Sequence, residues 1–132
     1  MIRWLRFLRD KRGAELVEAA ATLPIVITLV LGIIEFGWDL YAWQAAQQAV
    51  RHGVRAGSVA QVAPAVTAVA AAEDFAYNAG LKTADVHLTA PGGRPGMPLA
   101  LRIEYDPPNF LSQLFGFNPI ITAEATGRQE GW

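Results

Sequence analysis

At residues 12–34 the chain reads RGAELVEAAATLPIVITLVLGII. A basic leader ends at Gly13, and residues 19–34 then form an apolar segment without a single charge. A removable export signal has its cleavage site after the apolar stretch, with small residues near the cut. Nothing of that kind follows Ile34, whereas Gly13 lies before the stretch. We therefore expect any cleavage to fall after Gly13 and to leave the apolar segment on the mature chain.

The apolar segment has the character of a membrane anchor. Its sixteen residues would form a helix of about 24 Å, and the apolar and aromatic residues that flank it extend the predicted span to residues 19–37. The leader carries five basic residues and one acid, which are Arg3, Arg6, Arg9, Lys11, Arg12 and Asp10. This charge keeps the N-terminus in the cytoplasm, so the C-terminal part is predicted to be exported.

Composition excludes several classes of site. The 132 residues contain no cysteine, which rules out disulfides, thiolate metal sites and a cysteine nucleophile. The formal net charge is −1, so the chain beyond its basic leader is acidic. That balance argues against a nucleic-acid partner.

Helical periodicity continues beyond the membrane and predicts one long helix over residues 14–57. Apolar and small residues recur at steps of three and four and predict a single packing stripe, made of Ile33, Phe36, Leu40, Trp43, Gln47, Val50, Val54 and Gly57. Pro24 lies inside the segment, where we expect a kink or a local melting of the helix. Gly32 would permit the close approach of a neighbouring helix.

The rest of the chain, residues 58–132, predicts a small exported head. Pro64 opens an alanine-rich helix that ends before Gly80. The period then changes to two, with strands over residues 86–88, 99–105 and 120–126 separated by turn-forming residues. A long N-terminal helix, a second helix and a three-stranded antiparallel sheet give an α+β fold. The predicted segments are therefore a leader (1–13), a long helix (14–57) and a head (58–132).

Two features of this outline allow alternatives. The segment after the second strand carries an apolar cluster of Phe110, Leu111, Leu114, Phe115 and Phe117. We favour a role for this cluster in covering the sheet, and docking of a partner is the alternative. Glu35 and Asp39 form an acidic pair on the long helix, and Arg51 and Arg55 form a basic one. These pairs are either solvated or match each other between staggered helices.

No catalytic constellation emerges from the sequence. His52 and His87 fall on different elements, without a nearby ligand set. The run Gly92-Gly93-Arg94-Pro95-Gly96 lacks the Gly-Lys-Ser/Thr ending of a phosphate loop, so a hairpin turn is favoured. We expect no catalytic, cofactor-binding or metal-binding residues, and no enzymatic activity.

Four segments carry a resemblance to a known family. They are residues 12–18 (RGAELVE), 23–24 (LP), 32–37 (GIIEFG) and 49–56 (AVRHGVRA). In this order they closely resemble the TadE-like family, minor pilins (pseudopilins) of the bacterial tight-adherence, or Flp-type, pilus system. The likeness covers about residues 11–56.

The resemblance implies specific roles. Gly13 would precede the bond cut by a membrane-embedded aspartic prepilin peptidase, Ala14 would be the new N-terminus, and Glu18 would pair with that terminus on a neighbouring subunit. The residues expected to serve subunit packing are Glu18, Pro24, Gly32, Glu35, Arg51 and Arg55. The chain departs from the family at Ala19, where an aromatic residue is usual.

The implied function is that of a non-catalytic minor pilin that takes part in the assembly or priming of a Tad pilus. Its expected partners are other minor and major pilins, the prepilin peptidase, the inner-membrane assembly platform and membrane lipid, with no nucleic acid or small-molecule substrate. The expected location is the bacterial inner membrane, crossed once, with the head exported. The alternative is an uncleaved, membrane-anchored protein whose exported part is a binding or scaffold module.

Overall fold

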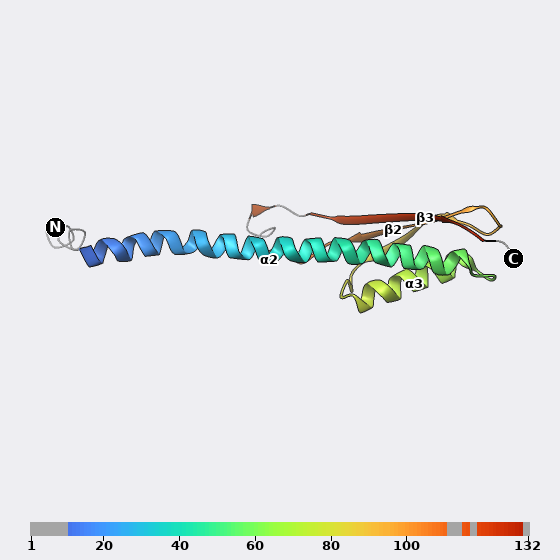
Figure 1. Ribbon diagram of the computed structural model, residues 1–132, viewed down its shortest axis with the longest axis horizontal. Coiled ribbons are helices and arrows are strands. Elements are labelled where there is room, and N and C mark those ends of the chain that lie inside the picture. The colour runs from blue at the N-terminus through green and yellow to red at the C-terminus, as the bar shows by residue number, and fades with distance from the viewer. Residues whose placement is uncertain (1–10, 111–114, 117–118, 131–132) are drawn as a thin grey trace. The chain divides into compact units, whose positions relative to one another are not determined.

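A computed structural model describes residues 11–110, 115–116 and 119–130. The elements follow in the order α2 (Lys11–Ser58), α3 (Pro64–Asn78), β1 (Asp85–Pro91), β2 (Pro98–Tyr105) and β3 (Ile121–Arg128) (Figure 1). The predicted α+β fold, with a long N-terminal helix, a shorter helix and three strands, is confirmed.

The chain divides into two compact units, residues 1–36 and residues 37–132. We call them the anchor unit and the head unit. Helix α2 supplies the described part of the anchor unit and continues into the head unit, which also contains α3 and the sheet.

The sheet is an antiparallel meander in the order β1-β2-β3. The connection between β1 and β2 is the turn predicted from the glycine-proline run, and the amide of Gly92 donates to the carbonyl of Pro98 at 3.1 Å. Gly93 has a φ of 103°, a backbone conformation that favours glycine. The amide of Gly93 donates to the side-chain oxygen of Gln129 at 2.6 Å.

Alternation along β2 and β3 separates a buried face of the sheet from a solvated one. The buried side chains of these strands on the core side are Leu99, Leu101, Ile103, Tyr105, Ile121 and Ala123. Arg102 and Glu104 lie between them on the solvated face, where their side chains form an ion pair of 2.9 Å. The clearest alternation in the sequence therefore predicted the half-buried strand correctly.

Small residues bring α2 and α3 close to the sheet. In the head unit, the buried residues of α2 are Ala42, Ala45, Ala46, Ala49, Val50, Gly53, Val54, Gly57 and Ser58. On α3 they are Ala68, Ala72 and Ala76. A Cβ added at Gly53 would lie 2.5 Å from the carbonyl oxygen of Ala68, so the two helices approach at this position as closely as glycine allows.

Within the single chain, the stripe predicted for α2 is buried only in its C-terminal part. Val50, Val54 and Gly57 are buried, but Phe36, Leu40 and Trp43 are 71%, 45% and 47% exposed. The core selects side chains by volume as well as by hydrophobicity, and the alanine face fits closer to the sheet than a face of aromatic rings.

Two further predictions need correction. Helix α2 is helical at every residue across Pro24, so local melting there is wrong. Proline removes one backbone donor, and the turns on both sides of it stay intact. Phe110 and Phe115, expected to cover the sheet, are 59% and 68% exposed. The other members of that cluster, Leu111, Leu114 and Phe117, lie outside the described residues.

Candidate functional site on helix α2

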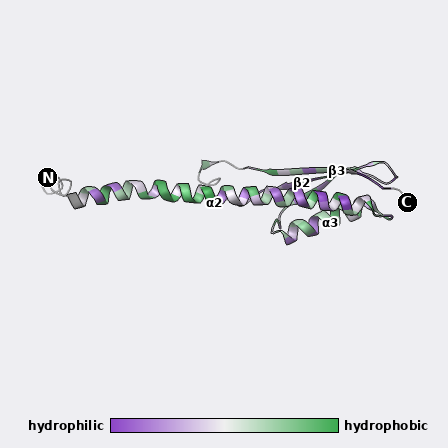
Figure 2. Cartoon of the chain, in the orientation of Figure 1, coloured by the Kyte–Doolittle hydropathy of each residue, from purple (hydrophilic) through white to green (hydrophobic). Residues whose placement is uncertain are grey.

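The anchor unit presents an apolar surface with almost nothing packed on it. Among the described residues, one helix, Gly13–Ser58, is long and apolar enough to cross a membrane, and its most apolar stretch has a mean hydropathy of 2.2 and is 0% buried. Every residue from 14 to 30 is exposed. Figure 2 shows the hydrophobic colouring along this first part of α2 and a mixed pattern further along. A helix of this kind is stable in lipid because its backbone groups bond to one another.

The two threonine hydroxyls within the span are satisfied by the helix itself. The hydroxyl of Thr22 donates to the carbonyl of Glu18, and the hydroxyl of Thr28 donates to the carbonyl of Pro24, both at 2.8 Å. An unsatisfied hydroxyl in hydrocarbon would cost several kcal/mol on alkane transfer scales, so these bonds make the two threonines compatible with lipid.

The predicted processing residues lie in the first turn of α2. The helix begins at Lys11, three residues earlier than predicted, so Gly13 and Ala14 are both helical. That first turn contains no acidic residue, but it contains the basic residues Lys11 and Arg12.

Glu18 is exposed and lies one helical turn beyond Ala14. Residues four apart share a face of a helix, so a carboxylate at Glu18 and a new terminus at Ala14 would be presented on one side of the anchor. Pro24 is exposed on the same unit, and Gly32 and Glu35 are half-buried.

The two basic residues of the predicted packing set belong to the head unit. Arg51 and Arg55 are exposed, and neither guanidinium forms an ion pair with any residue that the structure describes. Asp39, which the sequence grouped with Glu35, accepts a hydrogen bond of 3.5 Å from the side-chain amide of Asn109. That contact joins residues seventy positions apart, and no sequence pattern pointed to it.

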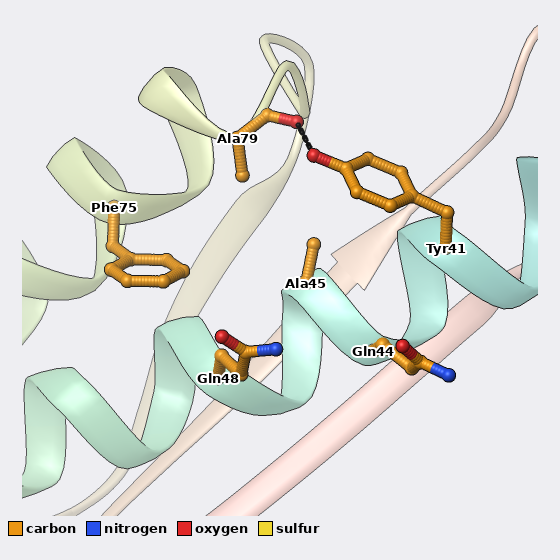
Figure 3. Close-up of a pocket in the computed structure, with 6 residues that line it drawn as sticks. All are labelled: Tyr41, Gln44, Ala45, Gln48, Phe75 and Ala79. Carbon is orange, nitrogen blue, oxygen red and sulfur yellow. Dashed lines mark hydrogen bonds between the residues drawn. The ribbon is translucent and has the colours of Figure 1, made fainter.

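Between α2 and α3 lies an open groove of about 140 Å³ (Figure 3). Its lining residues are Tyr41, Gln44, Ala45, Gln48, Phe75 and Ala79. The hydroxyl of Tyr41 reaches across from α2 and donates to the carbonyl of Ala79 at 3.1 Å. The groove holds two amides and a phenol, without a charged group.

The histidines contribute to packing and to the surface. His52 stacks against Phe75 with ring centres 5.4 Å apart, and His87 is exposed on β1 opposite Arg102. Within residues 11–110, 115–116 and 119–130, no three His, Cys, Asp or Glu side chains gather where they could hold a metal ion.

Comparison with known proteins identifies the anchor region. The family model described as TadE-like protein matches residues 13–55. No curated protein and no solved structure matches the chain. The match covers the glycine before the span, the span and the first part of the head unit, which are the residues that carried the resemblance in the sequence. Together with the exposed apolar helix, it supports a single-pass membrane anchor and an association with Tad pilus systems. Over residues 13–55 the chain is similar to the TadE-like family.

Proposed function

We propose that the chain is a non-catalytic minor pilin, or pseudopilin, that takes part in the assembly or priming of a Tad pilus. The observation that carries this proposal is the exposed apolar half of α2, which coincides with the family match. A surface of this kind is stable in lipid or against other apolar helices, so it suits a subunit that moves from a membrane into an assembly. The head is exported, and the N-terminus stays in the cytoplasm.

Cleavage after Gly13 would change the charges at the start of the helix. Hydrolysis of the Gly13–Ala14 peptide bond removes the basic leader and creates an amino group on Ala14. Glu15 then occupies the first turn of α2, which has no acid in the uncut chain. An acid in that turn interacts favourably with the helix dipole.

The new amino group gives Glu18 a partner. A lone carboxylate within the bilayer is unfavourable by about 2.5–3.5 kcal/mol on insertion scales. A charge-assisted hydrogen bond between Glu18 of one subunit and the Ala14 amine of its neighbour would offset this cost. Since only one stagger of the two helices brings these groups together, the pair would fix the register of packing.

Arg51 and Arg55 supply a second contact in this proposal. Their exposed guanidinium groups would face acidic side chains of a neighbouring pilin. The double reversal Arg51→Glu with Arg55→Glu would then reduce capture of partner pilins and leave the melting temperature of the head unchanged. Capture at the wild-type level would refute this contact.

The proposal is tested by the intact mass of the membrane-extracted chain, with and without the prepilin peptidase of the same Tad system. We expect an N-terminus at Ala14 when the peptidase is present and at Met1 when it is inactive. Purification from cross-linked membranes should recover pilins and components of the assembly platform with the cleaved chain. A chain that keeps Met1 and recovers no pilin would contradict the proposal.

That result would favour the second candidate, an uncleaved single-pass anchor whose exported head is a binding or scaffold module. One observation supports this candidate. The last three leader residues, Lys11, Arg12 and Gly13, are helical, so the helix continues across the expected cleavage site.

A further inference from the structure

The connection between β2 and β3, residues 106–120, exposes three large apolar side chains. Phe110 is 59% exposed, Phe115 is 68% exposed and Ile120 is 62% exposed. We call these three residues the loop patch. Several apolar side chains gathered on one connection mark a surface that meets something other than water.

The start of this connection is located by contacts within the head unit. The connection leaves the sheet after Tyr105 and returns at Ile121, and these two residues pair with each other at one end of the sheet. Asn109 is buried and donates to the carboxylate of Asp39 on α2. Phe110 is the next residue, with its Cα about 3.8 Å from that of Asn109. The loop patch therefore begins beside residue 39, close to Gly37, where the head unit joins the anchor unit.

Helix α2 carries a second apolar surface at this same level. Trp38, Leu40, Tyr41 and Trp43 are 43–47% exposed, and the rings of Trp38 and Tyr41 lie 5.6 Å apart. These residues directly follow the membrane span. Trp and Tyr are enriched where a membrane protein passes through the headgroup layer.

We propose that the loop patch enters the headgroup layer of the bilayer that α2 crosses. The head then contacts lipid through two segments that are distant in sequence, α2 near Trp38 and the connection near Phe110. Continuity with the span identifies lipid as the occupant of the patch. The proposal depends on α2 being a membrane anchor and does not depend on cleavage or on a role in a pilus.

The charges near the patch define the kind of contact. Residues 106–120 contain no lysine or arginine, while Asp106 lies within the connection and Asp39 lies beside it. Attraction to anionic lipid therefore does not hold the loop at the membrane. Burial of apolar surface does, so the contact is expected in zwitterionic lipid and is not expected to increase with anionic lipid.

Spin labels on the full chain test this proposal, because the absence of cysteine makes every introduced label unique. Phe115→Cys and Ile120→Cys each receive a nitroxide, and Met97→Cys is the matched control. Met97 is an apolar residue, 48% exposed, in the turn at the opposite end of the sheet. The labelled chains are reconstituted at high dilution in phosphatidylcholine vesicles, with and without phosphatidylglycerol. Collision rates with oxygen and with a water-soluble nickel chelate are then measured.

We expect the labels at residues 115 and 120 to collide more with oxygen than with the nickel chelate, and the label at residue 97 to do the opposite. The melting temperature of each variant verifies that its head is folded. Chelate access at residues 115 and 120 equal to that at residue 97 would overturn the proposal. Spin–spin broadening that grows with protein density would also overturn it, by making a second copy of the chain the occupant. A contact that required phosphatidylglycerol would contradict the apolar mechanism.

Discussion

Replacing Gly53 with alanine tests the packing of α2 against α3 and the sheet. A Cβ at this position would lie 2.5 Å from the carbonyl oxygen of Ala68, 2.7 Å from the Cβ of Ala72 and 2.8 Å from a methyl group of Leu101. Carbon atoms in favourable contact are about 3.5–4.0 Å apart. Two of these three neighbours are backbone or Cβ atoms, which cannot turn aside by a change of rotamer. The helices must therefore separate, by roughly 1 Å judged from that shortfall in distance.

The size of the effect follows from two opposing terms. Overpacking of a close contact costs about 1–3 kcal/mol, and the rigid neighbours of Gly53 place this substitution near the upper end. The higher helix propensity of alanine offsets about 1 kcal/mol. A net loss of about 2 kcal/mol lowers the melting temperature of a domain of this size by about 8–16 °C.

Thermal melting of the full chain in detergent micelles, followed by near-ultraviolet circular dichroism, measures this loss. Gly37→Ala is the matched control, because a Cβ there meets nothing within 4 Å. We expect that control to melt at or slightly above the wild-type temperature. A loss of about 1 kcal/mol would already lower the melting temperature by more than about 2 °C. If Gly53→Ala melted within about 2 °C of the wild type, the close packing at Gly53 would be refuted.

Three further outcomes are expected. Leu101→Ala, at a fully buried position, should lose about 2–5 kcal/mol of stability, whereas Val66→Ala on the exposed face of α3 should change it by less than about 0.5 kcal/mol; thermal melting checks both. Tyr41→Phe removes the hydrogen bond to α3 and should cost no more than about 1 kcal/mol, so a larger fall in melting temperature would contradict its modest role. Glu18→Gln should leave cleavage after Gly13 unchanged, as intact mass would show, and should reduce capture of partner pilins about tenfold, which corresponds to a loss of about 1.4 kcal/mol. The control Glu15→Gln should leave capture of partner pilins unchanged.

The strands and α3 were predictable because local rules agree with the fold at those elements. Alternation over residues 99–105 predicted β2 to within one residue, and Pro64 begins α3 as its fixed φ favours. The glycine-proline run predicted the turn between β1 and β2. At each of these positions backbone preference and side-chain burial point to the same structure.

The buried face of α2 was not predictable from hydrophobicity. The prediction gave priority to Phe36, Leu40 and Trp43 and passed over Ala42 and Ala46, which are 0% exposed. Alanine and glycine stand out little in a hydrophobicity pattern. They stabilise a close interface because they let two elements approach each other, and they bury little apolar area themselves. Beside a membrane span, large aromatic residues face outward at little cost.

The candidate site was predictable where it depends on chain order, and unpredictable where it depends on tertiary contact. Gly13, the apolar span and Glu18 are neighbours in sequence, so a single pattern revealed them. The bond between Asp39 and Asn109 arises only because the β2–β3 connection folds back onto α2. The sequence marked the apolar cluster that contains Phe110, but it did not decide between burial and exposure of that residue.

Alkaline extraction of membranes, followed by intact mass of the chain in each fraction, tests most directly whether the apolar half of α2 serves as a permanent anchor. The account predicts that the mature protein stays in the membrane pellet with residues 14–36 attached. A chain found in the supernatant, beginning beyond residue 37, would contradict it.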